Sequence, residues 1–221
     1  MKITLRICLV AMIGLSCSAG AAEEDGGLWA TADVSTALSE RLTGAAMLQF
    51  RFNDDIGRRE RTLLRPSLSY RIDPSQVLTL GYDAHFINLV DNEIEQRTWQ
   101  EYLLSKALSR FTASMRLRLE QRFFDHVDGV PVRLRIKPAL QVPVVNSPWF
   151  FSLSNEFFVS FNQVRGGQLH GFHENRAFAG FGRTIAEGVV GQLGYQNQYI
   201  ERIGRDVTIH QIFVGISVKL L

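Results

Sequence analysis

Arginine recurs at every second position in several stretches, and guanidinium groups are well suited to holding carboxylates or phosphates. Arg116, Arg118, Glu120 and Arg122 share one face of an alternating segment, and the positions between them are apolar apart from Gln121. Guanidinium groups stay charged and bind such anions through a bidentate fork. A row of them along a water-filled passage favours anions, whereas the same row paired with glutamates forms a structural network.

The alternation itself indicates where these side chains point. A period of two places successive side chains on opposite faces of a β-strand. If the apolar face meets lipid, the polar face points into a barrel. The candidate lumen-lining residues are Arg51, Arg65, Arg71, Arg116, Arg118, Glu120, Arg122, Arg133, Arg135, Lys137, Glu156 and Arg176.

The segments with this period cover most of the chain and predict an all-β, antiparallel transmembrane β-barrel of ten to twelve strands. They are Leu28–Leu38, Leu42–Phe52, Thr62–Ile72, Val77–Asn88, Glu95–Leu108, Phe111–Phe123, Val130–Val142, Trp149–Phe161, Asn175–Ile185, Val189–Ile200 and Val207–Leu221. Single-chain bacterial barrels normally have an even number of strands. We therefore expect ten or twelve, with Leu28–Leu38 outside the wall or one long segment divided in two.

Short connectors alternate with longer polar ones such as Asn53–Arg61 and Asn162–His173, which is typical of periplasmic turns and outer loops. Pro66 and Pro138 fall inside predicted segments, where a missing N–H donor indicates a strand end or a bulge. The end of the chain, Gly215-x-x-Val218-x-Leu220, resembles the C-terminal signal read by the outer-membrane assembly machinery, although Leu221 replaces the usual final aromatic residue. We expect that machinery to be a partner.

The first 22 residues have the features of a secretory signal: Lys2 and Arg6, a short apolar core, and small residues at 18–22. A lipoprotein signal acylated at Cys17 is the alternative. We expect residues 23–221 to form one barrel domain in the bacterial outer membrane, in contact with membrane lipids and lipopolysaccharide. Both cysteines, Cys8 and Cys17, lie in the signal, so disulfides and thiol chemistry are excluded from the mature chain. Its balanced charge does not favour a nucleic-acid partner.

A soluble periplasmic β-sandwich or small barrel would also alternate. Two features favour the membrane barrel instead: the outer faces are large and apolar across the predicted strands, and aromatic residues lie near strand ends, as in an interfacial girdle. These aromatic residues are Trp29, Tyr70, Trp149, Phe150 and Tyr199.

Three stretches carry a resemblance to a known family. They are Arg116-Leu-Arg-Leu-Glu-Gln-Arg-Phe123, Glu174-Asn-Arg-Ala-Phe-Ala-Gly-Phe-Gly182 and Leu193-Gly-Tyr-Gln-Asn-Gln-Tyr-Ile200. With the aromatic start at Leu28-Trp29, the chain resembles a family of exported bacterial proteins known as domain of unknown function 2490. The resemblance implies an outer-membrane-type β-barrel of unassigned function, and it carries over no catalytic residues.

Three functions remain open from the sequence. A narrow channel for anions or acidic solutes would use the inward arginines, and a filled structural barrel would pair them with glutamates. A lipid-modifying enzyme would need a nucleophile, a base and an orienting partner. The histidine candidates for it are His85 with Asp83, His126 with Asp125 and Asp128, and His210.

Two kinds of pattern in the sequence contain metal-ligating residue types. His170, His173 and Glu174 form a weak metal-binding pattern, and Asp125–Gly129 and Asn53–Asp55 are incomplete fragments of calcium loops. Solvated histidines and turn-forming residues explain both patterns. We therefore expect no catalytic residue, no metal and no cofactor.

Overall fold

The computed structural model describes residues 23–88, 93–125, 128–162, 164 and 169–220, and its regular elements are all β-strands. The predicted signal, residues 1–22, lies outside the described residues. Within the described part of the chain, no helix is long and apolar enough to cross a membrane. The strands are β1 (Glu23–Ala37), β2 (Leu42–Asn53), β3 (Arg58–Asp73), β4 (Gln76–Ile87), β5 (Glu93–Ala107), β6 (Thr112–Phe124), β7 (Val132–Pro143), β8 (Trp149–Ser160), β9 (Gly171–Ala186), β10 (Val189–Ile200) and β11 (Val207–Leu220).

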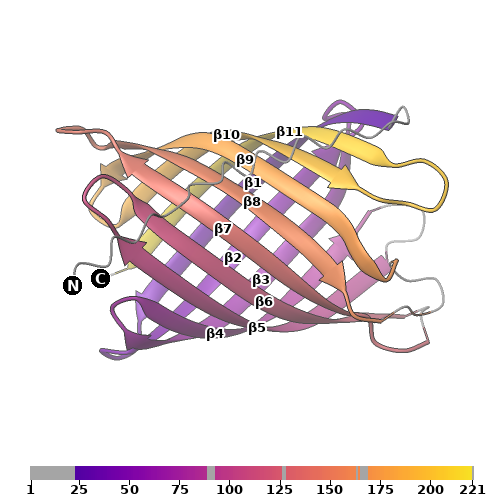
Figure 1. The fold of residues 1–221 in the computed structure, drawn as a ribbon, viewed down its shortest axis with the longest axis horizontal. Helices are drawn as coiled ribbons and strands as arrows, with labels where there is room; N and C mark the ends of the chain where they lie inside the picture. The colour runs from indigo at the N-terminus through magenta and orange to yellow at the C-terminus, as the bar shows by residue number, and fades with distance from the viewer. Residues whose placement is uncertain (1–22, 89–92, 126–127, 163, 165–168, 221) are drawn as a thin grey trace, which may run out of the picture.

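The strands close into one barrel in which each pairs with its neighbours in sequence, and β1 pairs with β11 (Figure 1). Consecutive strands are antiparallel, but the β1–β11 seam is parallel, with Leu28 opposite Ile212 and Val34 opposite Val218. The predicted barrel of ten to twelve strands is confirmed, with eleven in the described residues. The expectation of an even number was wrong. β1 is a wall strand that runs in the same direction as β11, and a parallel ladder closes the odd count.

The two rims of the barrel differ. Tight connections, such as residues 38–41 and 187–188, lie at the rim where β11 ends, and the longer loops lie at the rim where β1 begins (Figure 1). The first strand is fixed at the second rim by Glu23 N–H, which donates to the carbonyl of Asp206 at 2.9 Å. Part of the loop predicted at Asn53–Arg61 is strand, because β3 already begins at Arg58. Similarly, β9 begins at Gly171, inside the predicted loop Asn162–His173.

Both prolines lie inside strands and interrupt one ladder each. Pro66 is paired with Ala46 of β2, but the β3–β4 ladder breaks between Leu64 and Ser67. Pro138 pairs with Met115 of β6, while the β7–β8 ladder breaks between Ile136 and Ala139. Proline has no N–H to donate to a ladder, so each proline is accommodated by losing pairs on one side rather than by ending its strand.

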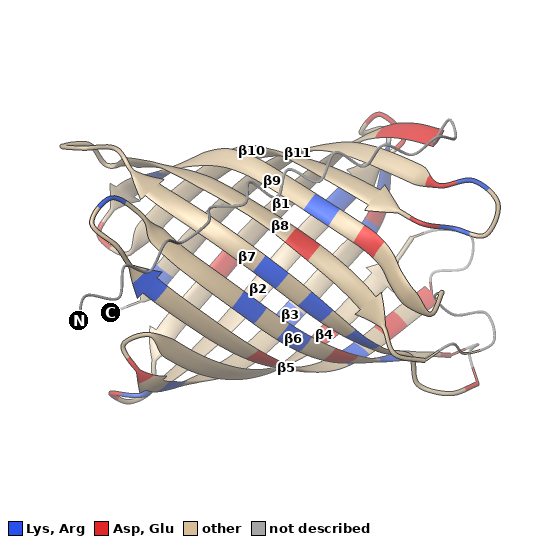
Figure 2. Cartoon of the chain, in the orientation of Figure 1, with Lys and Arg blue, Asp and Glu red and all other residues tan. Residues whose placement is uncertain are grey.

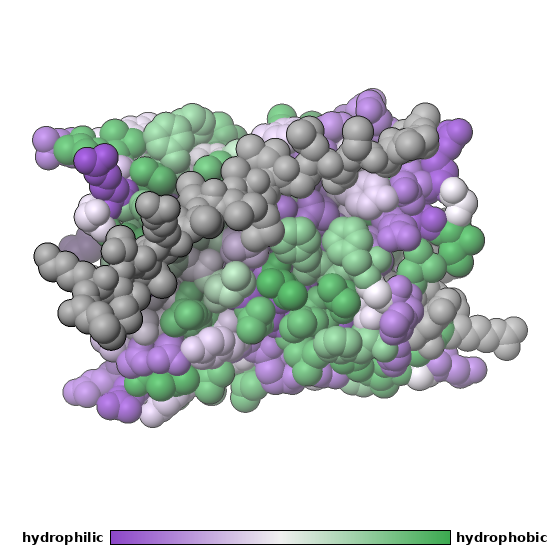
Figure 3. All heavy atoms as spheres, viewed as in Figure 1, coloured by the Kyte–Doolittle hydropathy of each residue, from purple (hydrophilic) through white to green (hydrophobic). Residues whose placement is uncertain are grey.

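Alternation gives the wall an apolar outer face and a polar inner face. On β6, Met115 and Leu117 are 38% and 39% exposed, whereas Arg118 and Glu120 are 4% and 0% exposed. Apolar side chains cover much of the outer wall between the two ends, where hydrophilic residues gather (Figure 3). The buried residues therefore lie inside the cylinder.

One glycine of the wall makes room for an inward tryptophan. Gly81 lies opposite Trp99 in the β4–β5 ladder, and an ideal Cβ at Gly81 would stand 2.0 Å from Cζ2 of Trp99. Trp99 is 2% exposed, and its indole N–H donates to Asp83 at 2.7 Å. A side chain at position 81 would displace the indole from this hydrogen bond.

We predict that Gly81→Ala lowers the free energy of unfolding by about 1–3 kcal/mol, the usual cost of overpacking a filled core. The control is Gly191→Ala on β10, where the new methyl group meets only the flexible end of Ile185; its effect should stay within about 0.5 kcal/mol. Urea titrations of the folded barrels measure both changes. Equal midpoints for the two variants would contradict the packing of Trp99 on Gly81.

Candidate functional site

The inward charges come from neighbouring strands, chiefly β3 to β9, and basic and acidic positions lie side by side (Figure 2). Antiparallel register brings them into contact because residues opposite each other share a face. Glu120 of β6 is opposite Arg133 of β7, and Arg97 of β5 is opposite Arg122 of β6. The strand ladders thus decide which guanidinium groups each carboxylate meets.

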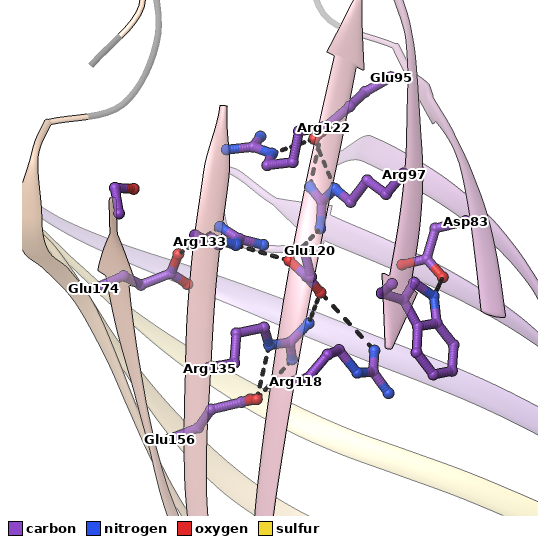
Figure 4. Close-up of polar contacts among 12 residues, drawn as sticks. Asp83, Glu95, Arg97, Arg118, Glu120, Arg122, Arg133, Arg135, Glu156 and Glu174 are labelled. Carbon is purple, nitrogen blue, oxygen red and sulfur yellow. Dashed lines mark hydrogen bonds and ion pairs between the residues drawn. The ribbon is translucent and has the colours of Figure 1, made fainter. Parts of the chain in front are cut away.

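Glu120 is the centre of this network (Figure 4). Its two oxygens accept hydrogen bonds from Nε of Arg133 and Nη1 of Arg135, both at 2.7 Å. The guanidinium groups of Arg97 and Arg118 each approach its carboxylate to 3.9 Å. Glu120 has no exposed surface, so four cations surround a fully buried anion. A buried charge of this kind is tolerated only when it is paired.

A second carboxylate, Glu95, organises the neighbouring part of the lumen (Figure 4). It accepts from Nε and Nη2 of Arg97 at 2.6 and 2.8 Å and also from Arg122, while Arg61 lies 3.4 Å away. Nearby, Asp83 receives both arms of the Arg65 fork at 2.7 and 2.6 Å. Glu95 and Asp83 are both fully buried.

Glu156 and Glu174 extend the network to β8 and β9. Glu156 accepts from Arg135 at 2.8 Å and from Arg116. Glu174 accepts from Arg176 at 2.6 Å and from the amide of Gln198 at 2.7 Å. These contacts continue the chain of paired charges around the inner wall.

Aromatic rings fill the space between the guanidinium groups. Arg118 lies 3.8 Å from the ring centre of Trp99, and Arg51 lies 3.9 Å from that of Trp29. The ring of Phe158, which has no exposed surface, faces three guanidinium groups at 4.5 to 4.8 Å. Such cation–π contacts are strongest where water is excluded. Paired charges and rings therefore pack one section of the lumen.

The rest of the lumen holds a cavity of about 370 Å³ that reaches towards the rim of tight turns. Its lining includes Ser105 near the end of β5 and Thr112 at the start of β6. Glu156 is its one acidic lining residue within the described part of the chain. The basic lining residues are Arg51, Arg65, Arg116, Arg135, Lys137 and Arg176. Its other polar lining residues are serines, glutamines and a threonine.

Four of the lining residues form an arc across adjacent strands. Arg116 of β6 is opposite Lys137 of β7, the β7–β8 register places Lys137 level with Glu156, and Glu156 is opposite Arg176 of β9. We call Arg116, Lys137 and Arg176, with Glu156 between them, the basic arc.

Two cations of the cavity lack a carboxylate partner among the described residues. Lys137 lines the cavity without an ion pair there. Arg51 donates instead to the neutral amide of Gln49 at 2.7 Å and lies over the ring of Trp29. Cations that are desolvated but not neutralised favour the binding of an anion. The cavity therefore has the electrostatic character of an anion site.

The protein-family model described as "Protein of unknown function (DUF2490)" matches residues 26–208. The chain belongs to this family. An uncharacterised protein of Methylorubrum extorquens is 29% identical over 201 residues, covering 87% of this chain and 85% of that protein. The predicted family is thus confirmed, although the name of this DUF2490 relative assigns no activity.

Two solved structures resemble the DUF2490 barrel. The NanC porin, in a rhombohedral crystal form, aligns with a TM-score of 0.58 at 14% identity, covering 89% of this chain and 98% of that one. A chain from a study of the in-meso crystallization of membrane proteins aligns with a TM-score of 0.44 at 10% identity, covering 88% and 81%. The porin shows that the DUF2490 chain has a porin-like fold.

The structure brings most of the candidate lumen-lining residues together. Arg71 lies apart from them, because it is exposed at the rim of tight turns and its guanidinium group donates to the carbonyl of Glu40. The other candidates contact the network or line the cavity; they are Arg51, Arg65, Arg116, Arg118, Glu120, Arg122, Arg133, Arg135, Lys137, Glu156 and Arg176.

Some members of the network were missed from the sequence. Arg61 was assigned to a loop, Glu174 to a metal-binding pattern, and Glu95 had no role. The spacing of Glu95 two residues before Arg97 was an available signal, because both then share a strand face. Trp29 was predicted for the interfacial girdle, but it is 5% exposed and points inward.

The histidines do not form the sites weighed for them. His85 is buried beside Asp83 at 3.4 Å and close to Arg61, so it belongs to the paired network. His210 faces outward and contacts the hydroxyl of Tyr195 at 2.5 Å, and His126 lies outside the described residues. His173 is buried in β9, whereas His170 is exposed. The described part contains no group of three or more metal-ligating side chains.

We predict that Glu120→Gln lowers the free energy of unfolding by about 3–5 kcal/mol, because it leaves buried guanidinium groups without their anion. The matched control is Glu60→Gln at the rim, where Arg61 is 3.7 Å away and water reaches both side chains; its expected effect is about 0–1 kcal/mol. Urea titration measures both variants. An unchanged midpoint for Glu120→Gln would mean that the arginines do not depend on this carboxylate.

Proposed function

We propose that this protein is an outer-membrane barrel that admits small anionic solutes to its lumen and conducts them as a narrow, anion-selective channel. The observation that carries the proposal is the lining of the cavity, in which six basic side chains meet one acidic side chain. The porin-like fold and the export signal expected from the sequence support the location. The rim of tight turns would then face the periplasm.

The chemistry of the cavity suits carboxylated or phosphorylated solutes. Arg116 and Arg176 of the basic arc already hold carboxylates of the protein, and Lys137 has no such partner among the described residues. Serine, threonine and glutamine side chains between the cations can donate hydrogen bonds to the same solute. In a narrow lumen surrounded by low-dielectric material, this excess of cations raises the local concentration of anions.

The section of the lumen that is packed by paired charges limits which solutes can pass. Glu120, Glu95 and Asp83 neutralise part of the positive charge there and have no exposed surface. A solute anion can follow the arginines only by exchanging with these carboxylates. The channel is therefore expected to be narrow and of low conductance, with its accessible anion site on the side of the tight turns.

A filled structural barrel is the second candidate, and one observation favours it. Each carboxylate of the network is held by at least one arginine, and arginines surround the fully buried Glu120 (Figure 4). A barrel of this kind would carry the same cavity without a through-path. Lipid modification has weaker support, because His85 is sealed in the network and its partner Asp83 is engaged by Arg65.

Single-channel current in a planar bilayer tests the channel, once a heat-dependent gel shift has shown that the protein is folded. We predict discrete, anion-selective steps. Lys137→Gln should reduce the preference for chloride over potassium, because Lys137 lines the cavity without a carboxylate partner among the described residues. The control is Lys106→Gln, which replaces an exposed lysine at the end of β5 and should leave the preference for chloride over potassium unchanged.

Cation-selective steps would contradict the proposal, and an absence of current steps from folded protein would favour the filled barrel. The lipid-modifying alternative has its own readout, which is a change in the mass of lipid or lipopolysaccharide incubated with the folded protein.

A further inference from the structure

The outer wall carries a polar cluster that lies among exposed apolar residues of β4 and β6. Gln96, Thr98 and Gln100 occupy three successive outward positions of β5, and Gln121 of β6 lies beside them, opposite Thr98. The three β5 side chains are exposed on the lipid-facing side. We call these four residues the amide patch.

The amide patch is held together by its own hydrogen bonds. The amides of Gln100 and Gln121 donate to each other at 3.2 Å, and the hydroxyl of Thr98 donates to Gln121 at 2.9 Å. Tyr82 of β4 donates to the carbonyl oxygen of Gln96 at 2.9 Å. Each primary amide has two N–H donors and two acceptor lone pairs, so these bonds use only part of its capacity. Donors and acceptors beyond these bonds are left for a partner on the exposed side of the wall.

Gln100 is the member of the patch that lies deepest in the membrane. Lys106 is the outward charge at the tight-turn end of β5. With a rise of about 3.3 Å per residue and a tilt of about 40°, Gln100 lies about 15 Å above it, inside an apolar band about 25 Å tall. The same rise and tilt place Gln96 about 25 Å above Lys106, at the far edge of that band. Outward apolar residues flank the patch on both sides: Gln121 lies between Leu119 and Phe123. Lipid head groups at the edge of the band are therefore too far away to satisfy Gln100.

An apolar hollow of about 460 Å³ adjoins the patch on the same wall. Gln100 belongs to both features, and Tyr102, the next outward residue of β5, continues into the hollow. Its leucines are Leu42, Leu68, Leu78, Leu80, Leu117, Leu119 and Leu134. An apolar recess beside a small set of polar groups is the composition of a protein interface rather than of a uniform lipid-facing wall.

We propose that the amide patch and its hollow form the interface of a two-fold symmetric homodimer within the membrane. Acyl chains have no group that bonds to an amide, and an unsatisfied polar group in hydrocarbon costs several kcal/mol. A second copy inserted in the same orientation presents the same amides at the same depth. A primary amide is both donor and acceptor, so a two-fold axis along the membrane normal lets each patch bond to its copy.

The inference depends on the barrel lying in a membrane, and it is independent of what the lumen carries. Conductance and association are measured separately, so failure of the channel proposal and failure of the dimer are distinguishable. A lipid bound at the patch is the competing occupant. It would leave the barrel monomeric in a bilayer, which the experiment detects.

Cysteine cross-linking in liposomes tests the dimer in the full chain with Cys8→Ser and Cys17→Ser. Leu119→Cys places a thiol beside Gln100 and Gln121, and Leu153→Cys places one on the outer face of β8. We expect a covalent dimer from the first variant and at least about tenfold less from the second, which corresponds to a preference of about 1.4 kcal/mol for the first face. Equal yields, or none from Leu119→Cys, would overturn the proposal.

A second comparison shows whether the amides themselves hold the copies together. Adding Gln100→Leu and Gln121→Leu to the Leu119→Cys chain should lower the dimer yield about tenfold, the effect of losing polar contacts of this kind in a membrane. The control adds Asn197→Leu on β10 to the Leu119→Cys chain, and it should not change the dimer yield. An unchanged yield in the double leucine variant would overturn the role of the amides. If that variant does not fold, the comparison of Leu119→Cys with Leu153→Cys still decides.

Discussion

The pairing of buried carboxylates with guanidinium groups is the interaction on which this barrel depends. A closed ring of strands satisfies the backbone, but it encloses the inward side chains in a narrow lumen where an isolated charge is very costly. Glu120 meets four guanidinium groups within 4 Å, and Glu95 and Asp83 are enclosed in the same way. The wall is therefore held by charge pairs in its interior where a soluble domain would use an apolar core.

The same pairing explains how an odd barrel closes without disturbing the lumen. The charged strands are chiefly β3 to β9, whereas the parallel seam joins β1 to β11, whose inner faces are mostly neutral. Gln211 of β11 bonds to the amides of Gln196 and Gln198 rather than to charges. Amides accept and donate in many geometries, so a seam with a changed hydrogen-bond pattern is placed where none of the ion pairs among the described residues depends on its register.

Local pattern was sufficient to predict the strands and their inward faces, because a period of two is a property of each segment alone. It could not predict which strands meet at the seam, since the β1–β11 ladder depends on closure of the whole ring. Nor could it pair Glu120 with Arg133 and Arg135, because that depends on the register between strands. His173 and Glu174 lie beside a register shift in the β8–β9 ladder, and a shift of one residue changes which face a side chain occupies.

The lumen therefore has two sections, one in which the charges are neutralised and one with an excess of positive charge. Where carboxylates match the guanidinium groups, the interior is filled and its charges are satisfied. Where they do not, a cavity remains, and Lys137 and Arg51 face it without a carboxylate partner in the described part of the chain. A wall that served only rigidity would gain no stability from unneutralised cations beside a cavity, because the cations repel one another and burial disfavours their charged form. The excess charge is explained if an anion from outside completes the pairing, with Glu156 as the protein's own carboxylate already in that position on the basic arc.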